Sequence, residues 1–120
     1  MSLQVNFNIL NKDDKVQTYE AGEKIFEEGQ TGKVMYYIRA GEVSIESNGE
    51  EISTLGAGDI FGEMALIDTT VRFADAVAKS ECQIVTIDER YFNFLIHEHP
   101  FFAVNVMRVL ADRLRKKTQA

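Results

Sequence analysis

A glycine, a glutamate and an arginine in one short stretch are the residues best suited to hold a ligand. Gly62 has no Cβ, so the backbone there can approach a bound molecule closely. The apolar run at 64–67 predicts a short helix, whose first N–H groups lack partners within the helix and attract anions. Arg72 carries a planar guanidinium that can grip a phosphate through two hydrogen bonds. With the carboxylate of Glu63, this set predicts a ligand that has one anionic group and a neighbouring hydroxyl.

Short strands separated by glycine-rich turns dominate residues 16–87 and must position these side chains. Residues 34–39 are rich in aromatic and β-branched types, which is typical of a buried strand, and residues 42–46 alternate polar with apolar. Asn48-Gly49 is a strong hairpin signal. About eight such strands predict a mainly β fold, a sandwich or jelly roll (double-stranded β-helix), with helices at its ends.

Helical spacing replaces the strand pattern from Asp88 onward. Asp88 is a suitable N-cap, and Pro100 marks a probable boundary before a second helix at about 101–117. The second helix has an apolar stripe formed by Phe102, Val106, Val109, Leu110 and Leu114. This stripe predicts packing against the strands and contact with a second copy or a partner protein.

The segment 61–78 resembles the phosphate-binding cassette of the cyclic nucleotide-binding domain family. The similarity is carried by Gly62-Glu63-Met64-Ala65-Leu66 with Arg72 nine positions after Glu63, and it extends from Tyr19 into the C-terminal helices. The family includes catabolite-activator-type regulators, protein kinase A regulatory subunits and cyclic nucleotide-gated channels. It implies one domain over residues 1–120: an N-terminal helical segment at 1–18, a β-roll at 19–87 and C-terminal helices at 88–120.

The resemblance also implies a ligand and a role for each cassette residue. Arg72 would pair with an equatorial oxygen of a cyclic phosphate, and Glu63 would accept a hydrogen bond from a ribose 2′-hydroxyl. Gly62, Met64 and Ala65 would offer backbone N–H groups. No cofactor is expected beyond the ligand itself, cAMP or cGMP.

Each assignment has a simpler alternative. Arg72 could be a surface arginine paired with Asp68 or Asp75, a contact worth under about 1 kcal/mol. Glu63 could be an acidic residue in a first helical turn, which the helix dipole favours without any ligand.

Two positions depart from the usual cassette, which has proline before its arginine and a small residue after it. Here these are Val71 and Phe73. Without proline the turn is less fixed in φ. The backbone N–H of Phe73 can still reach a phosphate, but its ring must either enter the barrel or crowd the pocket. Because Phe73 cannot supply the hydroxyl that guanine-preferring members often place here, cAMP is favoured over cGMP.

Charge and composition exclude several classes of function. The charges of residues 108–120 sum to +4, so those of residues 1–107 sum to −10 and the net charge is −6. A body this acidic argues against direct nucleic-acid binding. No apolar run approaches the roughly 20 residues of a membrane span, no secretory signal is visible, and the single cysteine, Cys82, fits a reducing cytoplasm. His97 and His99 are too few for a metal site, and no catalytic trio is present, so we expect no enzyme activity.

We therefore expect a cytoplasmic regulatory domain for signal transduction that binds a cyclic nucleotide and transmits occupancy through its C-terminal helices. Two alternatives stay open. One is a degenerate domain that binds no nucleotide and serves as a protein-interaction scaffold. The other is the sensor half of a transcription regulator that lacks its DNA-binding domain.

Overall fold

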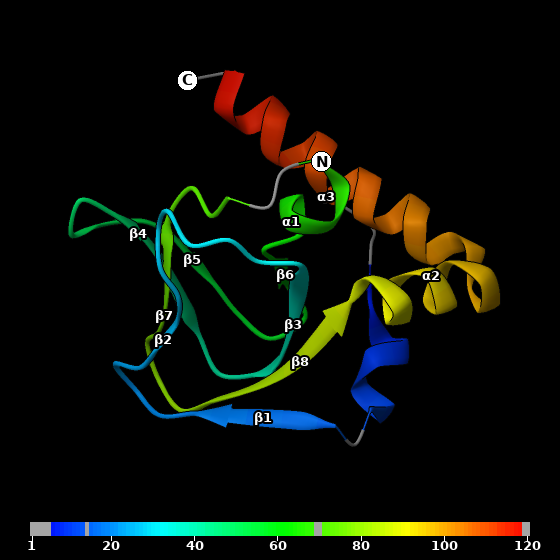
Figure 1. The fold of residues 1–120 in the computed structure, drawn as a ribbon, viewed down its shortest axis with the longest axis horizontal. Coiled ribbons are helices and arrows are strands. Elements are labelled where there is room, and N and C mark those ends of the chain that lie inside the picture. The colour runs from blue at the N-terminus through cyan, green and yellow to red at the C-terminus, as the bar shows by residue number, and fades with distance from the viewer. Residues whose placement is uncertain (1–5, 14, 69–70, 119–120) are drawn as a thin grey trace.

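Two antiparallel sheets build the molecule, and helices α2 and α3 pack beside them (Figure 1). The computed structural model describes residues 6–13, 15–68 and 71–118. In chain order the elements are η1 (Asn8–Lys12, a 3-10 helix), β1 (Val16–Tyr19), β2 (Lys24–Phe26), β3 (Val34–Ala40), β4 (Val43–Ser47), β5 (Glu50–Leu55), β6 (Ile60–Phe61), α1 (Met64–Ile67), β7 (Asp75–Ala78), β8 (Cys82–Asp88), α2 (Glu89–Glu98) and α3 (Pro100–Thr118).

The strands pair as a jelly roll. One sheet has the order β1-β8-β3-β6 and the other β2-β7-β4-β5, with every pair antiparallel. The predicted fold, about eight strands with C-terminal helices, is confirmed. Strand β1 starts at Val16, as the strand pattern of residues 16–87 predicts, inside the segment 1–18 that the resemblance implies to be helical. The described helix in that segment is η1.

Strand β3 is buried on both faces and divides the apolar interior into two clusters. Because side chains alternate along a strand, Met35 and Tyr37 face a cluster that includes Phe102 of α3, while Tyr36 and Ile38 face the inside of the roll. The first cluster fixes the helices to the sheet. The second lies next to the cassette and supplies aromatic rings around Arg72.

Local signals set the element ends where the sequence predicts them. The Asp88 side chain caps α2, its Oδ1 accepting a hydrogen bond from the Tyr91 backbone N–H at 2.8 Å. The β4–β5 hairpin turns through Asn48 and Gly49, both with positive φ (55° and 78°). The helix cap and the hairpin turn both depend on residues that are close together in the sequence.

Helix α3 presents one face to the roll. Phe102 and Val106 are buried, and Val109 and Leu110 pack partly against the same cluster. Leu114, predicted to continue this stripe, is 63% exposed, so the apolar contact ends before it. None of the helices in the described part of the chain is long and apolar enough to cross a membrane.

Candidate functional site

The residues predicted to bind a ligand line a single cavity of about 260 Å³ at the end of the roll: Gly62, Glu63, Met64, Ala65, Arg72 and Phe73. Strands β4 and β5 contribute Ile45, Ser53 and Leu55, and α3 contributes Arg113. The cavity therefore joins the cassette, the inner face of one sheet and the C-terminal helix. Thr69 and Thr70, between α1 and Arg72, lie outside the described residues.

Gly62 occupies a position that requires glycine for two reasons. Its φ is 73°, in the left-handed region that residues with a Cβ rarely adopt. A Cβ there would also lie 2.9 Å from Nη1 of Arg72 and 3.2 Å from the Tyr36 ring. Gly62 thus lets the backbone approach the Arg72 guanidinium closely, and its predicted approach to a ligand stays a prediction.

The Arg72 side chain is buried, with 6% exposure, and is held by backbone carbonyls. Its Nη1 donates to the Gly62 carbonyl at 2.9 Å and its Nη2 to the Val34 carbonyl at 2.8 Å. Its Cζ lies 4.3 Å from the centre of the Phe26 ring and 5.6 Å from that of Tyr36. These contacts orient the guanidinium at the cavity wall beside the first turn of α1.

Burial lowers the pKa of Arg72 from its ordinary value, and the neighbouring Tyr36 and Glu63 oppose that shift in part. An arginine still remains charged, so the cavity wall contains a desolvated cation. The alternative of a surface arginine paired with Asp68 or Asp75 is wrong because the side chain is buried. Asp75 pairs instead with Lys24.

The backbone at Arg72 is fixed by the loop between β2 and β3. Its N–H donates to the Gln30 carbonyl at 2.9 Å, and its carbonyl accepts from the Gly29 N–H at 2.8 Å. Val71 forms an antiparallel bridge with Thr31. This pairing constrains the turn at the position where the family usually has proline, so the loss of that residue does not leave Arg72 unsupported.

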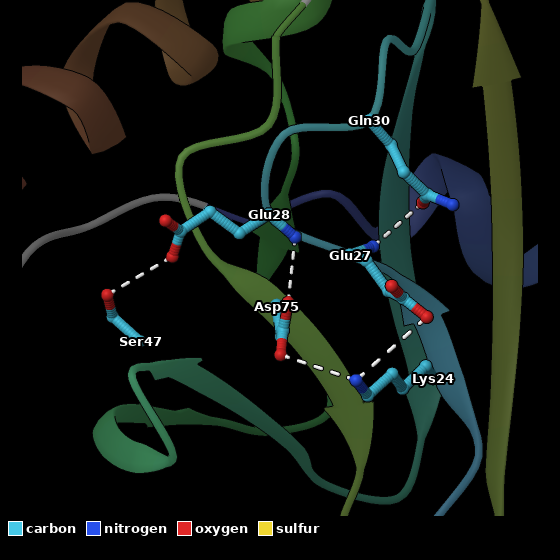
Figure 2. Close-up of polar contacts among 6 residues, drawn as sticks. All are labelled: Lys24, Glu27, Glu28, Gln30, Ser47 and Asp75. Carbon is cyan, nitrogen blue, oxygen red and sulfur yellow. Dashed lines mark hydrogen bonds and ion pairs between the residues drawn. The ribbon is translucent and has the colours of Figure 1, made fainter.

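The loop in turn is held by polar contacts around Asp75 of β7 (Figure 2). One oxygen of Asp75 accepts from the Glu28 N–H at 2.7 Å, and the other lies 3.6 Å from Nζ of Lys24. Ser47, at the end of β4, donates its hydroxyl to Glu28 at 3.2 Å. The loop is thus attached to β7 through Asp75 and to the end of β4 through Ser47.

Glu63 is 4% exposed and pairs with an arginine from the far end of the chain. Nη1 of Arg113 lies 2.5 Å from Oε1 of Glu63, and Nη2 of Arg113 donates to the Ile60 carbonyl at 2.6 Å. Glu63 is more than an acidic residue in a first turn, since it ties α3 to the cassette.

Sequence reasoning missed Arg113, which it did not single out among the basic residues of the C-terminal helix. A signal was present. Arg113 lies seven positions after Val106, on the face of α3 that packs against the roll. A cation on an otherwise apolar helix face needs a buried acceptor, and Glu63 is that acceptor.

The other predicted residues differ in how they meet the cavity. Met64 and Ala65 are partly buried, and the Ala65 N–H donates to the Gly62 carbonyl at 3.3 Å, so this predicted donor is used within the turn. The Phe73 ring does not enter the barrel: it lines the cavity mouth and is 68% exposed.

Comparison with known proteins agrees with this geometry. A jelly roll carrying a glycine, a buried glutamate and a buried arginine around one cavity defines a ligand-binding domain of the cyclic nucleotide type. The family profile for the cyclic nucleotide-binding domain matches residues 16–99. The chain belongs to this family.

Named relatives are regulatory proteins. The chain is 34% identical over 103 residues to the cyclic AMP receptor protein of Thermus thermophilus, covering 82% of this chain and 48% of the relative. It is 39% identical over 98 residues to the cAMP-dependent protein kinase regulatory subunit of Schizosaccharomyces pombe, covering 79% of this chain and 23% of the relative. The crystal structure of Thermus thermophilus catabolite activator protein superposes with a TM-score of 0.79 at 31% identity, over 88% of this chain and 52% of that one. The chain thus spans about half of two of these proteins and about a quarter of the third.

Proposed function

We propose that this domain senses a 3′,5′-cyclic nucleotide, with cAMP preferred over cGMP, and passes occupancy to its surroundings through α3. The ligand phosphate would lie at Arg72 and the first turn of α1, and the ribose at Glu63. The domain would act in the cytoplasm by a population shift rather than by turnover, without contacting nucleic acid or a membrane directly. The names of the two curated relatives support cAMP as the ligand class.

The observation that carries this proposal is the environment of Arg72. A buried cation is costly unless an anion or strong acceptors compensate it. In the described part of the chain Arg72 forms no ion pair with a carboxylate. The Tyr36 side chain and the charge of Glu63 act on it, and two of its N–H groups donate to the Gly62 and Val34 carbonyls. A guanidinium has five N–H donors, so these two bonds do not exhaust it. A phosphate in the adjoining cavity would supply the missing negative charge.

Transmission would run through the Glu63–Arg113 pair. An ionised carboxylate only accepts hydrogen bonds, so a ribose hydroxyl at Glu63 must share or displace the donor that Arg113 now provides. Either change alters the force holding α3 to the cassette. The exposed apolar side chains Phe101, Met107 and Leu114 of α3 would then relay the shift to a second copy or a partner protein.

Calorimetric titration tests the proposal directly. We expect the chain to bind cAMP, to bind cGMP more weakly, and to bind the 2′-deoxy analogue of cAMP more weakly as well. Absence of heat with all three ligands, at concentrations up to about 1 mM, would favour the scaffold alternative instead.

A further inference from the structure

Gly32, in the loop before β3, lies against the Arg72 guanidinium. A Cβ built on Gly32 would be 2.5 Å from Nη2, 2.6 Å from Nε and 2.7 Å from Cζ of Arg72. Gly32 is not among the glycines with positive φ, so its backbone conformation is open to other residues. The requirement at this position is therefore space for a guanidinium.

The remaining walls of this space are also specific. The Phe26 ring lies 4.3 Å from Cζ, and the carbonyls of Gly62 and Val34 accept from Nη1 and Nη2. We call the space bounded by Phe26, Gly32, Val34 and Gly62 the guanidinium slot. Nη2 is both the atom nearest to the missing Cβ and the donor to Val34, so a methyl group at Gly32 would strain that hydrogen bond first.

We propose that Gly32 is a positioning residue for the anion-binding arginine: by leaving the slot open, it sets where Arg72 presents its N–H groups to the cavity. The inference rests on the proposed function for its consequence in binding, while the slot is a property of the chain itself. No cassette motif points to Gly32, because it lies forty positions before Arg72 in the sequence.

The clash would be resolved by movement of Arg72 rather than of the loop. The guanidinium is the far end of a flexible side chain. The loop, by contrast, is fixed by the Thr31–Val71 bridge and by two backbone hydrogen bonds to Arg72. Gly32→Ala should therefore fold, with its guanidinium displaced from the slot.

The test compares Gly32→Ala with Gly56→Ala, whose added Cβ would meet nothing within 4 Å and whose φ is also not positive. By calorimetry with cAMP we expect Gly32→Ala to lose about tenfold in affinity, the scale of a weakened charge-assisted hydrogen bond. Gly56→Ala should bind like the wild type. In an Arg72→Ala background, Gly32→Ala should cause no further loss. Equal binding by wild type and Gly32→Ala, or the same loss with and without Arg72, would overturn the inference.

A second readout does not depend on ligand. The Arg72 side-chain Nε–H resonance, assigned as the signal that Arg72→Ala removes, should shift in Gly32→Ala and stay in place in Gly56→Ala. If the wild type binds no cyclic nucleotide, the proposed function fails, and this resonance still decides whether the slot exists. If Gly32→Ala does not fold, the double variant with Arg72→Ala must restore folding, and failure to do so would refute the slot.

Discussion

Two of the hollows in the described part of the chain differ in character, and the larger of the two has fewer marks of a binding site. An open cleft of about 760 Å³ lies at the start of α2, lined by Asp13, Arg90, Tyr91 and other residues. Two of its polar groups satisfy each other: the Tyr91 hydroxyl donates to Oδ2 of Asp13 at 2.6 Å. The cavity at the cassette has about a third of that volume, yet its wall contains the buried Arg72 guanidinium, which has no directly paired carboxylate among the described residues.

This contrast supports the proposed site at the cassette on the ground of charge rather than volume. In the cleft at α2, acid and hydroxyl form a finished pair that fastens η1 to α2. In the cassette cavity, each ionic group is held by a contact that a ligand can replace or share. The variants test whether removing a charged group at the cassette cavity weakens binding more than the same change in the larger cleft.

Arginine removal in each hollow gives the strongest test. Arg72→Ala should weaken cAMP binding by about 2–3 kcal/mol, the scale of charge-assisted hydrogen bonds in a desolvated site. Arg90→Ala, in the larger cleft, should leave affinity unchanged. Calorimetry on both variants decides the point, and equal losses would erase the distinction between the two hollows.

Arg113→Ala should destabilise the domain by about 2 kcal/mol, because it leaves the buried Glu63 carboxylate and the Ile60 carbonyl without their donor. This cost is smaller than the roughly 3–5 kcal/mol for breaking a fully buried ion pair, because the Arg113 side chain is 36% exposed to solvent. Arg115→Ala removes an exposed ion pair to Asp112 on the same helix and should cost under about 0.5 kcal/mol. Urea unfolding of both variants measures the difference. Equal costs would mean that α3 is not tied to the cassette through Arg113.

Glu63→Gln should reduce discrimination between cAMP and its 2′-deoxy analogue by about 1 kcal/mol, since an amide is a weaker acceptor than a carboxylate. Glu50→Gln, at an exposed position of β5 that does not line the cavity, serves as the control. The measured quantity is the ratio of the two dissociation constants. Should both ligands weaken equally in Glu63→Gln, the carboxylate does not read the hydroxyl.

Local signals were enough to predict much of the fold. The Asn48-Gly49 hairpin, the Asp88 cap and the helix at 64–67 depend on neighbouring residues, so their types reveal them. The cassette residues could be predicted because their order along the chain resembles a known family. Their gathering around one cavity agrees with that prediction, while their binding roles stay predictions.

Tertiary contacts account for what could not be predicted. Arg113 meets Glu63 across fifty positions, and Gly32 meets Arg72 across forty, so no local pattern pairs them. The exposure of Leu114 likewise depends on where the roll ends beneath α3.

In the larger cleft, a change in stability is expected without any effect on binding. Burial, with the hydrogen bond to Asp13, raises the pKa of Tyr91 above its ordinary value. A pKa raised by folding contributes stability that is complete below the unfolded value of about 10 and is lost as pH rises above it. Tyr91→Phe should therefore cost about 1 kcal/mol at pH 8 and less at pH 11, where the wild type has begun to lose this contribution. Urea unfolding at both pH values measures the change, and cAMP affinity at pH 8 should stay at the wild-type value. A loss of affinity in Tyr91→Phe would show that the cleft at α2 takes part in binding after all.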